Sequence, residues 1–553
     1  MKRTNATLIA SLLTVLCLLV PRVAAAQADK HDHDHPAPER LGTVDFPTTC
    51  APSTKAEFNR ATALLHSFAF LAATNGFEKV LAADPTCGIA AWGIALSAWG
   101  NPFSGMKTGA PLEKGAAAVG RAQTIGAQSQ RERDYIAAVA ELYKDAQTTD
   151  HPARIAAYER AMARVAATYP DDGEAQIFSA LASLQTAAPT DKTYAKQLKA
   201  GAVLERMFVQ APDHPGLAHY IIHAYDVPAL APRALDAARR YSQIAPAAAH
   251  ALHMPSHTFT RVGYWRESVE SNLASAAAAK REGTTAEQLH ALDYQTYAYL
   301  QMAQDDAVRR IVAEVPTIAT SLSAPTAGGG AAPVTAGGYA ASAIPARYAL
   351  ERGDWAGAAA LMPVDHVAPQ AEAVTHFARA IGAARAGKPS TIDADIARLT
   401  ALRDELTAKK DTYWAGQVEI QRVMASAWLA WIAGRKEEAF TLAAQGADAE
   451  DATEKAAVSP GPIAPAREML ADMLLEAGRA ADARTAYEQV LKREPRRFRA
   501  EYGAALSAER AGDQEGASVH YRSLVDICEK ADTPPRDELQ HARAFLAKAS
   551  ASR

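Results

Sequence analysis

Histidine is the residue type in this chain whose spacing most clearly indicates chemistry. Seven of the 16 histidines fall between residues 214 and 290. His219 and His223 are four residues apart, as are His253 and His257, so each pair is expected on one face of a helix. Imidazole nitrogens are preferred ligands of zinc, copper and iron. The pattern therefore indicates a site for a divalent metal ion.

A spacing of 34 residues relates the two histidine pairs. Pro212 aligns with Pro246 at this offset, and the same shift places both histidines of the first pair on those of the second. Equivalent positions of neighbouring helical hairpins face the same side of an array. We therefore expect the four imidazoles in one cavity on the concave side, with His250 on the same helix face as His253.

The next segment of the chain adds a carboxylate and one more imidazole. Aligning its expected turn near Ala303 with Gly263 sets Asp293 against His253 and brings in His290. The predicted metal ligands are therefore His219, His223, His250, His253, His257, His290 and Asp293.

Two alternatives compete with a metal site. The histidines could form a hydrogen-bonded polar groove without an ion, or they could be unrelated. A metal-free cluster is costly, since each unsatisfied buried polar atom costs about 1–3 kcal/mol. Pro255 adds a conflict, because a proline inside the second pair kinks a helix or makes it begin later. His66 and Glu174 are weaker candidates, and Glu174 is equally explained as a carboxylate in the first turn of a helix.

Turn glycines indicate the elements that position these residues. Gly478 and Gly512 lie 34 residues apart, each between two segments of helical pattern, and Gly353 and Gly434 mark two similar turns. This grammar resembles the tetratricopeptide repeat. The resemblance implies an all-α, superhelical solenoid of stacked helical hairpins.

Longer segments resemble a group of exported bacterial tetratricopeptide repeat proteins. They are residues 219–226 (HYIIHAYD), 250–257 (HALHMPSH) and 344–353 (IPARYALERG). The resemblance extends over most of the chain and implies the fold, with no activity attached to it.

Composition divides the chain into five parts. Residues 1–26 have the basic start, apolar run and small residues of a signal peptide, so we expect a secreted or periplasmic protein with no membrane span after cleavage. Residues 27–48, which include His31, His33 and His35, are expected to form a disordered His/Asp tail. An N-terminal array is expected over 49–318 and a C-terminal array over 339–545. The Gly/Ala/Pro-rich segment 319–338 would separate them.

Several function classes lack support in the sequence. The net charge is −4 and the pI near 6.5, so no basic surface indicates nucleic-acid binding. The chain has no nucleophile elbow, phosphate-binding loop, dinucleotide fingerprint or CxxC pair. Cys50 and Cys87 could form a disulfide or remain two buried thiols.

These observations support two hypotheses of different classes. The first is an exported solenoid with a histidine-rich metal site in its concave groove, acting as a metal-dependent enzyme or a metal-handling protein. The alternative is a periplasmic scaffold whose groove binds a peptide or a partner helix without metal.

Overall fold

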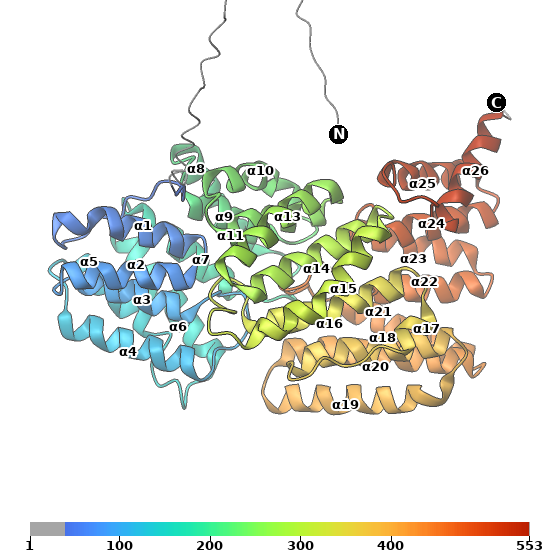
Figure 1. Ribbon diagram of the computed structural model, residues 1–553, viewed down its shortest axis with the longest axis horizontal. Helices are drawn as coiled ribbons and strands as arrows, with labels where there is room; N and C mark the ends of the chain where they lie inside the picture. The colour runs from blue at the N-terminus through green and yellow to red at the C-terminus, as the bar shows by residue number, and fades with distance from the viewer. Residues whose placement is uncertain (1–38, 552–553) are drawn as a thin grey trace, which may run out of the picture. The chain divides into compact units, whose positions relative to one another are not determined.

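The computed structural model describes residues 39–551, and all the regular structure in that range is helical. Residues Arg40–Arg553 form one compact unit (Figure 1). The predicted all-α fold is therefore confirmed, while the expected signal peptide and residues 27–38 of the expected tail lie outside the described range. No described helix has both the length and the apolar character needed to cross a membrane.

The helices before the Gly/Ala/Pro-rich segment are η1 (Pro52–Thr54), α1 (Lys55–His66), α2 (Phe70–Ala83), α3 (Gly88–Trp99), α4 (Ala110–Ile125), α5 (Gln130–Ala140), α6 (His151–Thr168), α7 (Gly173–Gln185), α8 (Ala195–Gln210), α9 (Pro215–Ala224), η2 (Ala231–Ala234), α10 (Leu235–Ile244), α11 (Ala249–His253), α12 (Pro255–Arg261), α13 (Trp265–Glu282), α14 (Thr285–Gln301) and α15 (Asp305–Ala319).

The helices from that segment onward are η3 (Thr320–Ser323), α16 (Val334–Glu351), α17 (Trp355–Ala359), α18 (Pro369–Arg385), η4 (Pro389–Thr391), α19 (Ile392–Ala408), α20 (Thr412–Ile432), α21 (Lys436–Asp451), α22 (Ala466–Glu476), α23 (Ala480–Arg493), α24 (Phe498–Arg510), α25 (Gln514–Ile527) and α26 (Asp537–Ala551).

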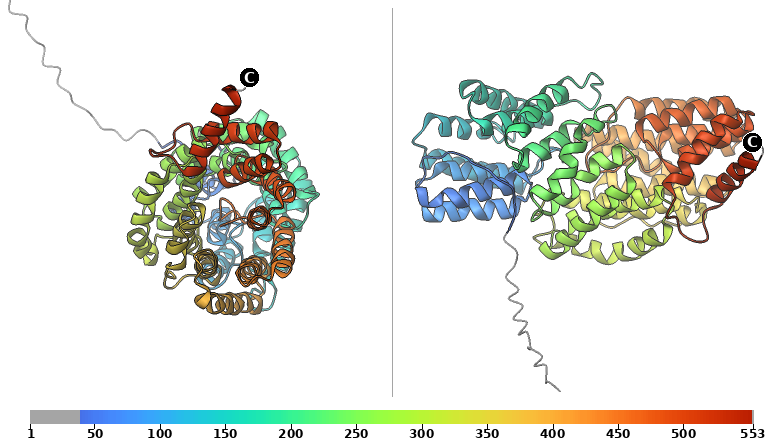
Figure 2. Two further views of the ribbon diagram at one scale, coloured as in Figure 1. Left: turned by 90° about the vertical axis from the view of Figure 1, so that its right-hand side faces the viewer. Right: turned by 90° about the horizontal axis from the view of Figure 1, so that it is seen from above.

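Successive helices pair as hairpins, and the hairpins stack side by side (Figure 2). All four predicted turn glycines, Gly353, Gly434, Gly478 and Gly512, lie between two helices with φ between +64° and +81°. Glycine adopts this left-handed region without the steric cost that a Cβ atom brings. Small residues then let the paired helices approach closely. In α21, for example, alanines at 439, 443 and 447 form one buried face.

The segment expected to divide two arrays is shorter than 319–338 and is packed. Helix α15 ends at Ala319, α16 begins at Val334, and α14 packs directly against α16. We call residues 324–333 the bridging loop. The Gly329 carbonyl accepts a hydrogen bond from the backbone N–H of Leu71 (3.1 Å), and the Ala331 carbonyl accepts one from Asn101 (3.1 Å). The loop is therefore held against the first helices of the chain.

The end of the expected tail also belongs to the folded unit. Residues 39–48 form no helix, but Leu41, Val44 and Phe46 are buried. Their alternation with polar neighbours lets an extended segment bury one side. Just beyond, Cys50 and Cys87 form a disulfide, which is one of the two states that the sequence left open.

Candidate metal centre

The structure gathers all six histidines of the predicted site, from helices α9, α11, α12 and α14. They form two groups, and within each group the candidate ligand atoms lie within 4.8 Å of one another. We call them the first triad (His219, His223 and His250) and the second triad (His253, His257 and His290).

This grouping differs from the expected single set of four. The two triads are neighbours, with ring centroids 6.2 Å apart for His223 and His257 and 5.8 Å apart for His250 and His253. His250 completes the first triad because α11 passes beside α9. His290 completes the second because α14 packs behind α11. Two adjacent three-nitrogen sites therefore take the place of one four-nitrogen site.

Pro255 interrupts the helix without moving the second pair out of register. Helix α11 ends at His253 and α12 begins at Pro255, but Met254 between them keeps helical angles (φ −53°, ψ −35°). His253 and His257 therefore remain one turn apart, and their Nε2 atoms lie 3.0 Å from each other.

Hydrogen bonds on the far side of these two rings fix where their protons lie. His253 Nδ1 lies 2.6 Å from Asn272 Oδ1, and the Asn272 amide nitrogen donates to the Ser268 carbonyl (2.7 Å). The Asn272 oxygen must accept, so His253 Nδ1 carries the proton. His257 Nδ1 donates to the Asp226 carboxylate at 2.9 Å. A neutral imidazole has one N–H, so both Nε2 atoms present bare lone pairs to each other.

Two opposed lone pairs at 3.0 Å require a cation between or beside them. Burial lowers the pKa of both rings, and for His253 well below the ordinary value, so a shared proton is disfavoured. Two nitrogens bound to one tetrahedral zinc ion at 2.0–2.1 Å lie about 3.3 Å apart. The pair is therefore within a few tenths of an ångström of the spacing that a metal ion imposes.

Asp226 orients the second triad from a strongly cationic setting. Its Oδ1 accepts from Arg261 Nε at 2.9 Å, while Oδ2 accepts from His257. Burial alone would raise the pKa of Asp226, but Lys455, Arg261 and His257 outweigh it and hold the pKa well below its usual range. The carboxylate stays charged, so it keeps the Nε2 of His257 free of a proton. Metal-bound histidines characteristically have such a partner.

The first triad has similar outer partners. His219 Nδ1 donates to the His66 carbonyl (2.6 Å), one of the last carbonyls of α1, which have no partner within their own helix. His219 Nε2 lies 3.1 Å from His223 Nε2. His250 Nδ1 lies 3.0 Å from Glu287 Oε1, and Glu287 Oε2 accepts the backbone N–H of Ala332 in the bridging loop (2.7 Å).

Both triads open onto one cavity of about 490 Å³. His219 and His253 are fully buried, whereas His223, His250, His257 and His290 line the cavity. The Phe103 ring stacks on His223 with centroids 4.2 Å apart. Each triad thus has a protein side, which fixes its rings, and an open side toward the cavity.

The seventh predicted ligand, Asp293, lies outside both triads. Its carboxylate faces the Arg347 guanidinium, with 2.7 Å between Oδ1 and Nε, and both side chains are fully buried. The offset of 40 residues placed Asp293 opposite His253, but His290 occupies that place, with ring centroids 4.4 Å apart. A buried carboxylate requires a partner, and Arg347 supplies it.

His66 and Glu174 belong to a separate buried network. The Glu174 carboxylate accepts from Nε2 of His66 (2.8 Å) and from Nε2 of His214 (3.0 Å), and the hydroxyl of Tyr220 lies 3.0 Å from His66 Nδ1. Hydrogen bonds therefore engage both ring nitrogens of His66 and both oxygens of Glu174 without an ion. The role of this network at the triads is mechanical, since the backbone carbonyl of His66 holds His219.

Four functional side chains were missed by the sequence analysis. Asp226 and Glu287 each lie three residues from a triad histidine in the chain, which is a usable signal for an orienting carboxylate. Asn272 and Lys455 have no such signal, because the fold alone brings them to the site. Burial lowers the pKa of Lys455 to about 8.

Comparisons with known proteins bear on the fold alone. No family model and no curated protein matches the chain. Among solved structures, a human IFIT1 dimer with m7Gppp-AAAA matches at 9% identity and a TM-score of 0.34, covering 80% of this chain and 89% of that one. The tetratricopeptide repeat domain of P58(IPK) matches at 12% identity and 0.20, covering 90% and 99%. Naa15/Naa10 bound to HypK-THB matches at 11% and 0.22, covering 90% and 91%. At these scores the fold assignment rests on the chain's own stacked hairpins.

Proposed function

We propose that this protein binds two transition-metal ions, one in each triad, and presents them to the shared cavity. The observation that carries the proposal is the opposed pair of bare Nε2 atoms of His253 and His257. All six candidate donors are imidazole nitrogens, a set that suits zinc, copper or iron. An ion in either triad would hold three protein ligands and keep a position open, as catalytic sites do.

An open position beside a cavity favours a metal-dependent reaction over simple storage. A bound ion there would activate water or polarise an oxygen of the substrate. The residues of the chain orient the rings through Asn272, Asp226 and Glu287, and the walls of the cavity limit access. A storage or delivery protein has no need of the cavity.

Export supports the same proposal. The signal-like segment and the Cys50–Cys87 disulfide both suit an oxidising compartment outside the cytoplasm. Mass spectrometry of the protein recovered from the periplasm or the medium should show a mature chain beginning near residue 27.

Metal content of the purified protein tests the proposal. We expect about two equivalents of one metal after loading and removal of excess ion. His253→Ala/His257→Ala and His219→Ala/His223→Ala should each lose about one equivalent. His520→Ala is the control, because that ring is paired with Glu501 (2.7 Å) far along the chain. Wild-type protein that stays metal-free would overturn the proposal. If such protein retains one defined partner, the function is that of a peptide-binding scaffold.

A further inference from the structure

Lys455 is a buried ammonium group without a hydrogen-bond partner among the described residues. It lies between α21 and α22, and its side chain is 9% exposed. Its three N–H donors reach no acceptor within hydrogen-bond distance. The nearest carboxylate oxygen, Asp226 Oδ2, is 3.5 Å away, too far for a strong charge-assisted hydrogen bond.

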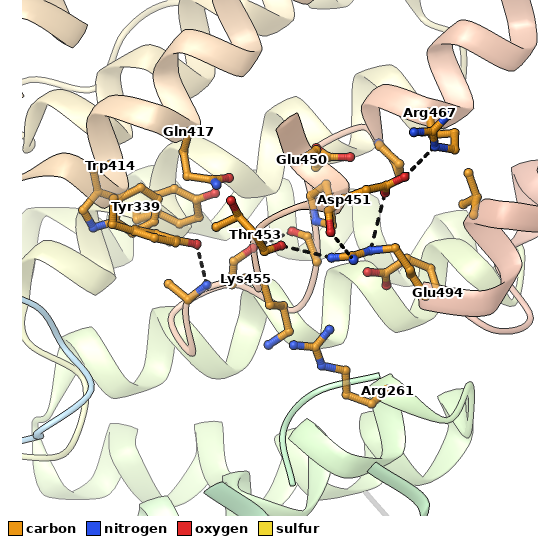
Figure 3. A pocket seen from close by; sticks show the side chains of 18 residues that line it. Arg261, Tyr339, Trp414, Gln417, Glu450, Asp451, Thr453, Lys455, Arg467 and Glu494 are labelled. Atoms are coloured by element: carbon orange, nitrogen blue, oxygen red, sulfur yellow. Dashed lines mark hydrogen bonds and ion pairs between the residues drawn. The ribbon is translucent and has the colours of Figure 1, made fainter. Parts of the chain in front are cut away.

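Asp226 has little capacity left for Lys455. Its two oxygens already accept from Arg261 and His257, and Arg261 also donates to the Asp226 backbone carbonyl at 2.9 Å. Figure 3 shows the Lys455 and Arg261 head groups pointing toward each other near this carboxylate. Two like charges so placed favour a further anion nearby.

The same ammonium lines the cavity into which the triads open. Other unpartnered buried polar atoms also belong to cavity-lining residues: His151 Nδ1, Gln185 Nε2 and Gln197 Oε1. Aromatic side chains, including Tyr413 and Trp414, form part of the wall. A volume of about 490 Å³ lies in the range of pockets for small molecules. The cavity therefore suits a small ligand with polar groups and an apolar part.

We propose that this cavity binds a small molecule bearing a carboxylate or phosphate group, and that Lys455 donates hydrogen bonds to that oxyanion. The oxyanion would lie beside the second triad, so the rest of the molecule would lie across the open side of the metal sites. The inference extends the proposed metal function by naming the substrate class, but the Lys455 site itself requires no ion.

Binding of inorganic phosphate to metal-free protein tests the inference separately from the metal sites. We expect saturable binding by isothermal titration calorimetry and a rise in melting temperature with phosphate. Lys455→Met should weaken binding about tenfold or more, because a charge-assisted hydrogen bond is lost. Lys410→Met is the matched control, since Lys410 lines the same cavity but is exposed and paired with Asp150 (3.1 Å).

The outcomes separate the two proposals. Equal phosphate affinity in wild type and Lys455→Met, or no binding by the wild type, would overturn the anion site whatever the metal content. Binding that depends on Lys455 in a chain that never retains metal would support the anion site and reject the metal function. Circular dichroism and the melting temperature of each variant without phosphate show whether it is folded.

Discussion

Asp226 links the protonation of the second triad to its ability to hold a metal. The charged carboxylate keeps the proton of His257 on Nδ1, and an amide in its place would be a weaker acceptor. Asp226→Asn should therefore lower the metal affinity of the second triad about 10–100-fold. A competition titration against a chromophoric chelator would measure it, with the first triad as internal reference.

A matched pair elsewhere controls for loss of any histidine–carboxylate contact. His376 Nδ1 lies 2.7 Å from Asp395, remote from both triads in the chain. Asp395→Asn should leave both metal affinities unchanged. Unchanged affinity in Asp226→Asn as well would show that the carboxylate does not tune the site.

Glu450 gives a pH dependence that is independent of the metal. Desolvation in the small pocket of Figure 3 raises the pKa of its carboxyl to about 8, against 4.5 for the free group. The folded state therefore binds more protons than the unfolded state between these values, and the free energy of unfolding falls as pH rises through that window.

Glu450→Gln should remove this fall, since its amide does not titrate. We expect the melting temperature of the wild type to drop more steeply between pH 6 and pH 8.5 than that of the variant. A pH series of thermal melts checks it. Parallel curves would mean that the folded carboxyl titrates near its ordinary value.

At the residue scale, spacing predicted the six histidines but not their partition into two triads. Residues four apart on a helix share a face whatever the tertiary structure, so both pairs followed from sequence. Which third ring joins each pair depends on how α11 and α14 pack. Asp293 illustrates this point, because its partner Arg347 is 54 residues away in the chain.

At the scale of elements, two turn glycines allow a matched test of the stacking. Gly263 and Gly434 have similar φ values of +73° and +77°. A Cβ atom at Gly263 would lie 2.6 Å from the backbone oxygen of Pro495, whereas one at Gly434 would meet nothing within 4 Å. Alanine at either position should cost about 1 kcal/mol from the left-handed backbone alone.

Gly263→Ala should therefore destabilise the protein more than Gly434→Ala, because it must also separate the turn before α13 from the segment before α24. Urea denaturation compares the two free energies of unfolding. Equal losses would argue against this close contact between distant hairpins.

The turns were predictable because the left-handed conformation selects glycine locally. The bridging loop was harder to interpret. Its composition is typical of a flexible break, yet Ala327, Ala331 and Ala332 are buried. Small residues suit both a flexible linker and a loop that packs closely, and only the neighbouring helices distinguish the two.

At the scale of the whole molecule, the disulfide ties the first extended segment to α3. It closes a separation of 37 residues, for which the loss of the cross-link typically costs 2–4 kcal/mol. Cys50→Ala/Cys87→Ala should lower the melting temperature of the protein. Dithiothreitol should do the same to the wild type and have no effect on the double variant. A wild type that melts identically with and without reductant would show that the bond does not form.

The bridging loop has a consequence for the order in which a working site can arise during synthesis. Every triad histidine has been made by residue 290, yet the N–H that holds Glu287 comes from residue 332 and the cavity ammonium from residue 455. A nascent chain therefore carries all its candidate ligands well before it carries their supports. Ions captured early would be held loosely and could still exchange. The final, selective occupancy would be set only after the later helices had closed around the cavity.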